Sequence, residues 1–118
     1  GPCPNRVNQL LLSTDVWVGA LIRRAELEGA NAVVVKKGDA RAGAVIVKAY
    51  DTATRTCRLW TEATGQDGEP LWIQPVASET ESELDAYLDR QRRYDPDLWI
   101  VEIEDRQGRH FLTEKTQG

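Results

Sequence analysis

The feature that most constrains the fold is the stretch 95–112 near the C-terminus. Asp95-Pro96-Asp97 is typical of a turn, and the β-branched and aromatic run that follows, over 99–104, is typical of a strand. An Asp-x-x-Gly turn and a second short apolar run come next, so the stretch predicts a β-hairpin. With a four-residue loop, Glu104 would pair with Arg109, Ile103 with His110 and Val101 with Leu112. A bulged turn would shift this register by one residue and leaves the face of His110 open.

Two further segments have helical patterns. Three successive N-cap candidates, 13–15, precede an amphipathic run, and Gly29 suits the left-handed residue that ends such a helix. Ser78 and Glu81 match a capping box, which predicts that Ser78 is the N-cap of a second helix. The apolar stripe of this second helix is narrow, so most of its surface is expected to face water. The helices are expected over 16–28 and from 79 to about 93.

Strand-like runs fill the interval between the helices, and the first two, 32–35 and 44–50, are expected to form an antiparallel pair. The order α-β-β-β-(β)-α-β-β predicts a single α+β domain over 13–113, with a mainly antiparallel sheet of 5-6 strands. Both helices are expected on one face of the sheet. The predicted members of its single core are Trp17, Leu21, Ile22, Val33, Val35, Val45, Val47, Leu84, Leu88, Trp99, Val101 and Ile103.

The two ends of the chain are expected to lie outside the domain. Gly1-Pro2 resembles the remnant of a cleaved purification tag, and residues 1–12 are expected to form a tail with it. Residues 114–118 are expected to form a second tail.

Length, charge and cysteines limit the classes of function. A chain of 118 residues suits one domain, and a net charge of −4 argues against nucleic acid as a partner, because phosphates require a positive footprint. No apolar run is long enough to span a membrane and none resembles a signal peptide, so no membrane association is expected. Cys3 and Cys57 lack the spacing of a disulfide framework, which favours a reducing, cytoplasmic setting.

One cluster of cations has the composition of an anion site. Lys36, Lys37, Gly38 and Arg41 lie in a glycine-containing turn, where successive amides with cationic neighbours can hold an anion. The turn is not a P-loop, because it lacks the Gly-Lys-Ser/Thr ending and precedes a strand. The alternative is a charged turn that keeps the tip of two strands soluble. Arg23 and Arg24 of the first helix are expected to lie near this turn.

No catalytic motif is recognisable. His110 is the single histidine, and neither cysteine stands at a spacing that suggests a nucleophile or a metal ligand beside it. The carboxylates over 95–105 resemble a nuclease strand only faintly, because Glu102-Ile103-Glu104 lacks the lysine of an acid-x-Lys motif. We therefore expect a non-enzymatic protein with no catalytic residue, no metal and no cofactor.

Four tryptophans are many for this length, and two of them are candidates for an interface. Trp60 and Trp72 flank the polar loop at 63–70, where an exposed tryptophan could anchor a protein partner. The equally weighted alternative is that both fill a small core that is poor in phenylalanine. Arg90 and Arg93 on the water-facing second helix complete the predicted protein interface.

The chain resembles a family of short alphaproteobacterial proteins catalogued as domain of unknown function 1491. The resemblance implies a stand-alone cytoplasmic protein and no activity, because it brings no catalytic or binding residues with it. It spans nearly the whole chain beyond Leu12. The stretches that carry it are Asp15-Val16-Trp17-Val18, Ala20-Leu21-Ile22-Arg23-Arg24, Lys37-Gly38-Asp39, Ala42-Gly43-Ala44 and Tyr94-Asp95-Pro96-Asp97-Leu98-Trp99-Ile100-Val101-Glu102-Ile103-Glu104-Asp105.

Two functions follow from these observations. The first is a small adaptor or regulatory module that binds another protein, with self-association left open; it is favoured by the acidic charge and by the exposed second helix. The alternative is a protein that binds phosphorylated ligands or nucleic acid through the 36–43 turn and the first helix. Convergence of the cations on one concave face with free amides would favour the alternative, and scattered cations, with Arg24 paired to Glu28, would favour the module.

Overall fold

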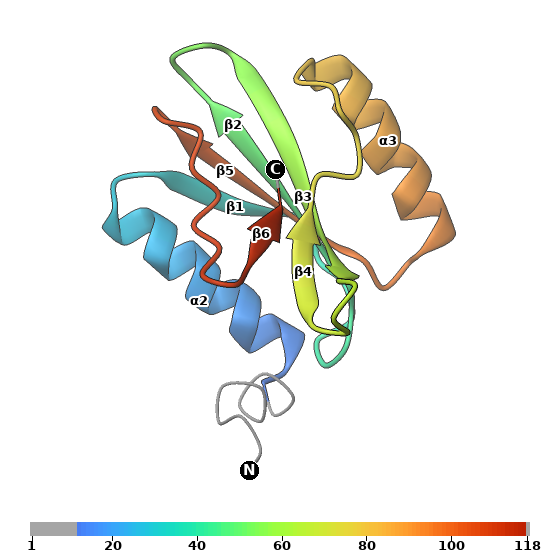
Figure 1. Ribbon diagram of the computed structural model, residues 1–118. Helices are drawn as coiled ribbons and strands as arrows, with labels where there is room; N and C mark the ends of the chain where they lie inside the picture. Colours follow the sequence, from blue (N-terminus) through green and yellow to red (C-terminus); the bar gives the residue numbers. More distant parts are fainter. Residues whose placement is uncertain (1–11, 118) are drawn as a thin grey trace.

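The computed structural model describes residues 12–117 and shows two helices and a six-stranded sheet in this range (Figure 1). The predicted α+β class is confirmed. Gly1-Pro2, Cys3 and the rest of the predicted tail as far as residue 11 lie outside the described residues, as does Gly118. The elements are α2 (Thr14–Leu27), β1 (Asn31–Lys36), β2 (Val45–Asp51), β3 (Thr56–Thr64), β4 (Pro70–Ile73), α3 (Glu81–Tyr94), β5 (Trp99–Asp105) and β6 (Thr116–Gln117).

The sheet is mixed and has the order β1-β5-β2-β3-β4-β6. β1 pairs with β5, β2 with β3, and β3 with β4 in antiparallel fashion, whereas β2–β5 and β4–β6 are parallel. The predicted pairing of the first two strands is wrong, because β5 lies between β1 and β2. β5 suits this central position because each of its faces reaches a core: Val101 and Ile103 face one core and Ile100 the other, although Glu102 and Glu104 share the face of Ile100.

The predicted C-terminal hairpin is also wrong. The turn at 95–98 does form, with the Leu98 amide donating to the Asp95 carbonyl, and β5 follows as expected. No strand lies within residues 106–115, so the expected partners of Glu104, Ile103 and Val101 do not pair with them. The residue opposite Glu104 on one side is Asn31 of β1, and on the other it is Tyr50 of β2.

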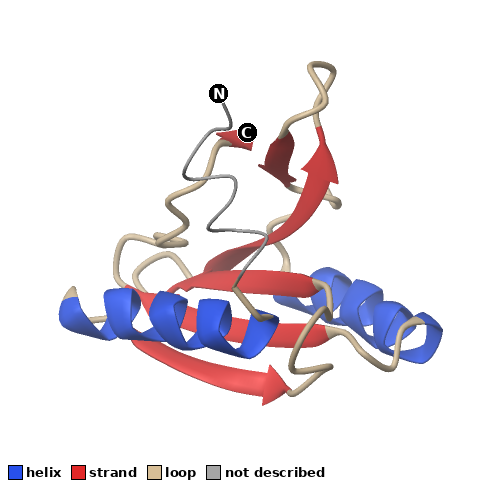
Figure 2. Ribbon diagram, turned by 90° about the horizontal axis from the view of Figure 1, so that it is seen from below, coloured by secondary structure: helices blue, strands red, loops and turns tan. Residues whose placement is uncertain are grey.

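The two helices lie on opposite faces of the sheet, which corrects the expectation that both share one face. α2 packs over β1 and β5, α3 lies over β3, and the sheet passes between them (Figure 2). Consequently there are two cores. The core on the α2 side contains Leu21, Val47, Trp60, Trp72, Trp99 and Val101 among others, and the core on the α3 side contains Ile46, Cys57, Leu59, Leu84, Leu88 and Ile100.

Most of the predicted core residues are buried, with two clear exceptions. Trp17 and Ile22 are partly buried against the α2-side core. Val33 and Val35 are exposed, because β1 is an edge strand and neither helix packs over its outer part. The buried members of the predicted set are Leu21, Val45, Val47, Leu84, Leu88, Trp99, Val101 and Ile103.

The first helix begins and ends where local signals predict, but the second does not. Ser13 is the N-cap of α2, and Gly29 adopts a φ of 90° after its C-terminus. Thr80, not Ser78, is the N-cap of α3. The Cys57 amide donates to the Glu79 carbonyl, which holds the chain extended beside β3 and delays the helix. Ser78 accepts a hydrogen bond from the Thr80 amide instead.

The predicted C-terminal tail is part of the domain as far as Gln117. β6 adds to the outer edge of β4, with Thr116 opposite Trp72. The segment that leads to β6 lies on the α2 side of the sheet, where Phe111 and Leu112 join the core. It covers the half of that face that α2 leaves open, as Figure 1 shows.

Candidate functional site

The predicted cationic turn lies at the start of α2, but its charges and amides are largely engaged. The amides of Thr14 and Asp15 donate to the carbonyls of Arg41 and Ala40, so the turn itself covers this end of the helix. Lys36 donates from its ammonium to the carbonyls of Pro96 and Leu98, at 2.7 and 2.9 Å. Lys37 and Arg41 remain exposed.

The backbone of the turn does not offer a row of free donors. The Asp39 amide donates to the Asp97 carbonyl, and the amides of Arg41 and Ala42 donate to the Asp39 carboxylate. Gly38 packs so closely on the Asp97 carbonyl that a Cβ would overlap it. These amides hold the turn together and are unavailable to an anion.

Arg23 and Arg24 do not join this turn. Arg24 is nine residues along α2 from Asp15, which corresponds to about 13 Å of helix. Its Nε donates to the carbonyl of Phe111 on the C-terminal segment. Glu28 forms an ion pair with Arg109 at 3.6 Å, not with Arg24. The predicted cations are therefore scattered over two ends of the helix.

The predicted tryptophan interface is wrong for Trp60 and Trp72, because both side chains are buried. They belong to the core on the α2 side, and the rings of Trp60 and His110 meet edge to face with their centroids 4.8 Å apart. Arg90 and Arg93 of α3 are exposed as expected. The Arg90 guanidinium lies 5.9 Å from the centre of the Tyr87 ring.

An exposed apolar surface lies at the opposite edge of the sheet, on β1. We call Val33, Val34 and Val35 the valine edge; their exposed fractions are 45, 40 and 47%. β1 pairs only with β5 among the described strands, so its outer main-chain groups face away from the sheet. The register shifts between Val34 and Lys36, which places a bulge at the end of the strand.

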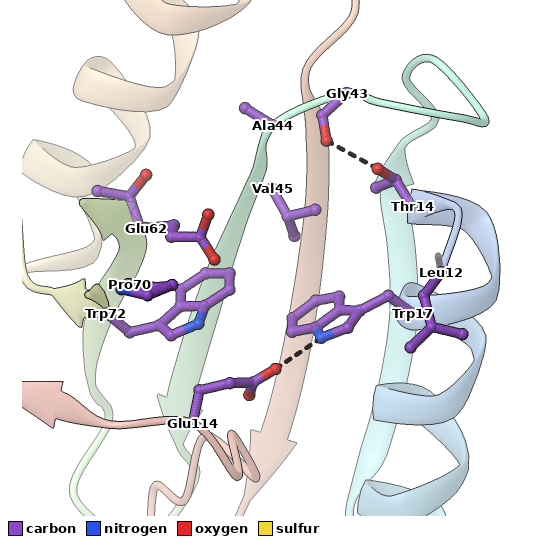
Figure 3. A pocket seen from close by; sticks show the side chains of 11 residues that line it. Leu12, Thr14, Trp17, Gly43, Ala44, Val45, Glu62, Pro70, Trp72 and Glu114 are labelled. Carbon is purple, nitrogen blue, oxygen red and sulfur yellow. Dashed lines mark hydrogen bonds between the residues drawn. The ribbon is translucent and has the colours of Figure 1, made fainter. Parts of the chain in front are cut away.

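A pocket of about 360 Å³ lies on the α2 side of the sheet (Figure 3), and none of its lining residues belongs to β1. It opens between the first turn of α2, the β2–β3–β4 part of the sheet and the C-terminal segment. We call it the tryptophan pocket. Its lining residues are Leu12, Thr14, Trp17, Gly43, Ala44, Val45, Thr61, Glu62, Pro70, Trp72 and Glu114.

Two stacked indoles form one wall of the tryptophan pocket. The rings of Trp17 and Trp72 are 7° from parallel, with their centroids 5.3 Å apart. Trp17 donates from Nε1 to Glu114 Oε2 at 2.7 Å. The Trp72 Nε1 is buried, and no residue within 12–117 accepts a hydrogen bond from it. In Figure 3 this nitrogen is on the edge of the indole that faces Trp17 and Glu114.

The electrostatics of the tryptophan pocket are negative. Desolvation by the surrounding protein raises the pKa of the Glu62 carboxyl, and the charge of Glu114 raises it further. None of the lining residues in the described chain is a lysine or an arginine. The two carboxylates therefore share the pocket with no cation among its described lining residues to balance them.

Neither the lone histidine nor the buried cysteine is arranged for catalysis. His110 Nδ1 accepts a hydrogen bond from the Leu112 amide, and burial lowers the pKa of the ring. Burial raises the pKa of the Cys57 thiol to about 11, so this thiol is protonated at neutral pH. Within residues 12–117, no group of three or more His, Cys, Asp or Glu side chains could hold a metal ion.

Sequence reasoning missed the role of three residues that line the tryptophan pocket. Nothing in the sequence distinguishes Glu62 from an ordinary strand glutamate, and Glu114 lies in the segment 114–118 that the sequence predicts to be a tail. Trp17 was expected to be a core residue. For the valine edge one signal did exist: successive strand residues point to opposite faces, so Val33-Val34-Val35 could not all face one core.

Comparisons with known proteins agree on one family. The model of the family described as "Protein of unknown function (DUF1491)" matches residues 12–113. A crystal structure of a DUF1491 family protein from Caulobacter crescentus CB15 is 65% identical, covers 91% of this chain and 100% of its own, and has a TM-score of 0.88. Protein Atu0922 from A. tumefaciens, solved in solution, is 33% identical, covers 91% and 97%, and has a TM-score of 0.75.

An NMR structure of a DUF1491 family protein from Caulobacter crescentus CB15 is likewise 65% identical, covers 92% of this chain and 98% of its own, and has a TM-score of 0.85. The source organisms are alphaproteobacteria. No curated protein matches the chain. Neither helix in the part of the chain that the structure describes is long and apolar enough to cross a membrane.

Proposed function

The chain belongs to the DUF1491 family, and we propose that it is a small, non-enzymatic protein-interaction module that adds an extended segment of another protein to its valine edge. The observation that carries this proposal is an edge strand with three consecutive exposed valines. Natural edge strands are usually short, charged or covered, because an open apolar edge pairs with other chains. A strand from a partner would satisfy both the main chain and the valines of β1.

Both faces of β1 can contribute to such an interface. Val33 lies opposite Glu102 and Val34 opposite Val101, so the two valines point to different faces of the sheet. α3 lies over β3 and leaves the α3-side face of β1 open. An added strand would therefore contact Val34 on one face and Val33 on the other.

The charge near the valine edge favours a basic partner over a second copy of this chain. Glu102 and Glu104 lie beside β1 on β5, and Lys48 is shared among Glu102 and two carboxylates of α3. On the α3-side face beside Val33 the carboxylates therefore outnumber Lys48, whereas Lys36 and the exposed Lys37 lie at the C-terminal end of β1; the whole chain has a net charge of −4. Two copies paired through β1 would bring two acidic surfaces together, whereas a segment with lysine or arginine would neutralise one.

The alternative function, binding of phosphorylated ligands or nucleic acid at Lys37 and Arg41, has less support. Those two cations are exposed, but the amides of the turn are engaged, and Arg23 and Arg24 lie elsewhere on α2. We further propose a cytoplasmic location, which is supported by the free thiol of Cys57 in the described chain.

Selection of peptides from a random displayed library on the immobilised protein tests the interaction module. We expect the selected peptides to alternate apolar and basic residues and to shift the backbone amide signals of residues 31–36 in ¹⁵N-labelled protein. Val33→Lys should abolish binding by repelling the basic peptide, and the fold should persist because the new ammonium lies opposite Glu102. Val16→Lys, a matched change at an exposed valine of α2, should leave binding unchanged.

Two results would overturn the proposal. One is a set of selected peptides whose shifts map away from β1. The other is a concentration-dependent dimer, seen by analytical ultracentrifugation, that Val33→Lys dissociates, because the edge would then pair with a second copy.

A further inference from the structure

We propose that the tryptophan pocket binds an organic cation: a primary ammonium or guanidinium group on a short apolar stem, with an oxygen acceptor at the stem's other end. The pocket lies over β2, β3 and β4, whereas the valine edge is at the far side of the sheet. The inference therefore stands independently of the proposed interaction module.

Two carboxylates, Glu62 and Glu114, give the tryptophan pocket its negative charge. Glu62 reaches the pocket from β3, opposite Trp72 on β4, and Glu114 reaches it from the C-terminal segment. Glu114 is held in place, because one of its oxygens accepts from Trp17 Nε1 and the other from the Thr113 amide. Desolvation, and after it the charge of Glu114, makes the ionised form of Glu62 less favourable. A cation bound between them would remove this repulsion.

The cation has to come from outside the described chain. The eleven lining residues include no lysine, arginine or histidine. A metal ion is a poorer fit, because no group of three or more His, Cys, Asp or Glu side chains within residues 12–117 could hold one, and the indoles of the pocket offer a metal no ligand atom. An organic cation requires fewer oxygen contacts and also gains from the indoles, whose faces attract positive charge.

The indole of Trp72 adds a second requirement on the ligand. Its side chain is 3% exposed, yet its N–H has no acceptor among residues 12–117. A buried donor without a partner is costly, and an ammonium or guanidinium group cannot accept its hydrogen bond. The ligand therefore needs a hydroxyl or carbonyl oxygen as well as a cation. A purely apolar ligand would leave both the carboxylates and this N–H without a partner.

The walls of the pocket set the size of the stem. Leu12, Val45 and Pro70 supply apolar surface between the charged and aromatic groups. A volume of about 360 Å³ accommodates an alkyl chain with its two polar ends and leaves the mouth open to solvent. This chemistry occurs both in free amino alcohols and amino amides and in a lysine or arginine side chain next to its own main-chain carbonyl.

NMR titration of the ¹⁵N-labelled protein tests the proposal, with the indole N–H signals of Trp17 and Trp72 as reporters. The probes are 5-amino-1-pentanol for a free ligand and the peptide Gly-Gly-Lys-Gly-Gly for a side chain. The controls are 1,5-pentanediol and 5-hydroxypentanoate, which keep the stem but are neutral and anionic. We expect at least one cationic probe to shift both signals saturably and neither control to do so. A response to the free probe alone identifies a small-molecule site, and a response to the peptide alone identifies a side-chain site.

Charge-neutralising variants separate the pocket from the overall acidity of the protein. Glu62→Gln and Glu114→Gln should each weaken binding at least about tenfold, because each removes one charge and keeps the side chain's shape. Glu26→Gln is the matched control on α2, outside the pocket, and should leave binding unchanged. Trp72→Phe should bind 5-amino-1-pentanol no better than pentylamine, since the donor for the hydroxyl is gone.

The proposal is overturned if no probe produces a saturable shift up to about 10 mM, a concentration at which even millimolar affinity is visible. It is equally overturned if the neutral or anionic control shifts the two indole signals as the cations do. If Glu26→Gln weakened the binding of the cationic probe as much as Glu62→Gln does, the effect would be a general electrostatic one, and this result would also overturn the proposal. Heteronuclear spectra of each variant establish that the fold is retained.

Discussion

Lys48 of β2 donates hydrogen bonds from its ammonium to Glu81 of α3 at 2.7 Å and also to a second carboxylate, Asp85, at 2.9 Å. Glu102 of β5 is the third acidic neighbour, at 3.3 Å. The Lys48 side chain is only 5% exposed, and a lysine buried to this extent is tolerated only when carboxylates pair with it. This ammonium therefore joins the start of α3 to two central strands of the sheet.

Replacement of Lys48 should loosen α3. Lys48→Met keeps most of the buried stem but leaves three carboxylates facing one another without a cation. We expect a loss of about 2–3 kcal/mol in the free energy of unfolding, somewhat below the cost of breaking a fully buried pair because the carboxylates are partly exposed. Urea denaturation measures it, and Lys37→Met, at an exposed lysine, is the control. A loss no larger than that of the control would contradict the assigned role.

The sequence predicts the parts of this fold that depend on neighbouring residues. The turn at 95–98 and the left-handed Gly29 are local features, and both are where the pattern places them. The position of β5 is not local, because its two partners lie in β1 and β2, far earlier in the chain. A hairpin is the natural local interpretation, because Glu102 and Glu104 alternate with apolar residues and suggest that one face of 99–105 meets water.

Close backbone contacts explain Gly43, whose carbonyl accepts a hydrogen bond from Thr14 at the start of α2. A Cβ at Gly43 would overlap the carbonyl oxygen of Asp97, and the Trp99 ring would lie 2.9 Å away. Gly43→Ala should therefore destabilise the protein by about 2 kcal/mol or more, since the obstacle is backbone that cannot move without breaking the turn. Gly19→Ala, in α2 with no atom near the new methyl group, should stabilise it by up to about 1 kcal/mol. Thermal unfolding of both variants distinguishes the two outcomes.

Asp105 controls part of the acid stability. The Arg109 guanidinium and the amides of Arg109 and Gln107 lower the pKa of the Asp105 carboxyl to about 2, from an ordinary 3.8. The folded state therefore favours the ionised form. The resulting stability is present above about pH 4 and is lost as the pH falls towards 2.

Asp105→Asn should lose this contribution at every pH. We expect the variant to be less stable than the wild type at pH 7 by about 2 kcal/mol, and the difference should shrink as the pH approaches 2. Urea denaturation at a series of pH values measures both quantities. A difference that stays constant down to pH 2 would show that the charge of Asp105 is not the cause.

The candidate sites were less predictable than the fold, because they depend on contacts between residues that are far apart in the chain. Glu114 meets Trp17 across 97 residues of chain, and only the β4–β6 pairing brings them together. The exposure of Val33 depends on β1 being an edge strand, which no pattern within 31–36 reveals. Whether the cations of the 36–43 turn and those of α2 lie together was also open from the sequence, because their separation depends on how the turn packs on the helix.

Glu62 should oppose stability at neutral pH. Desolvation, followed by the charge of Glu114, raises the pKa of the Glu62 carboxyl above its ordinary 4.5. Between 4.5 and the raised value, the folded state holds a proton that the unfolded chain has released, so stability falls as the pH rises through this window. Glu62→Gln removes the titrating group and should be slightly more stable than the wild type at pH 7, with no such fall.

The control for this effect is Glu83→Gln, which neutralises an exposed carboxylate of α3 outside the tryptophan pocket and changes net charge equally. Thermal midpoints between pH 4 and pH 8 give the comparison. A Glu62→Gln variant that is less stable than the wild type at pH 7 would contradict the expected repulsion between Glu62 and Glu114. A Glu62→Gln variant that is more stable than the wild type would support a pocket whose negative charge serves a ligand rather than the fold.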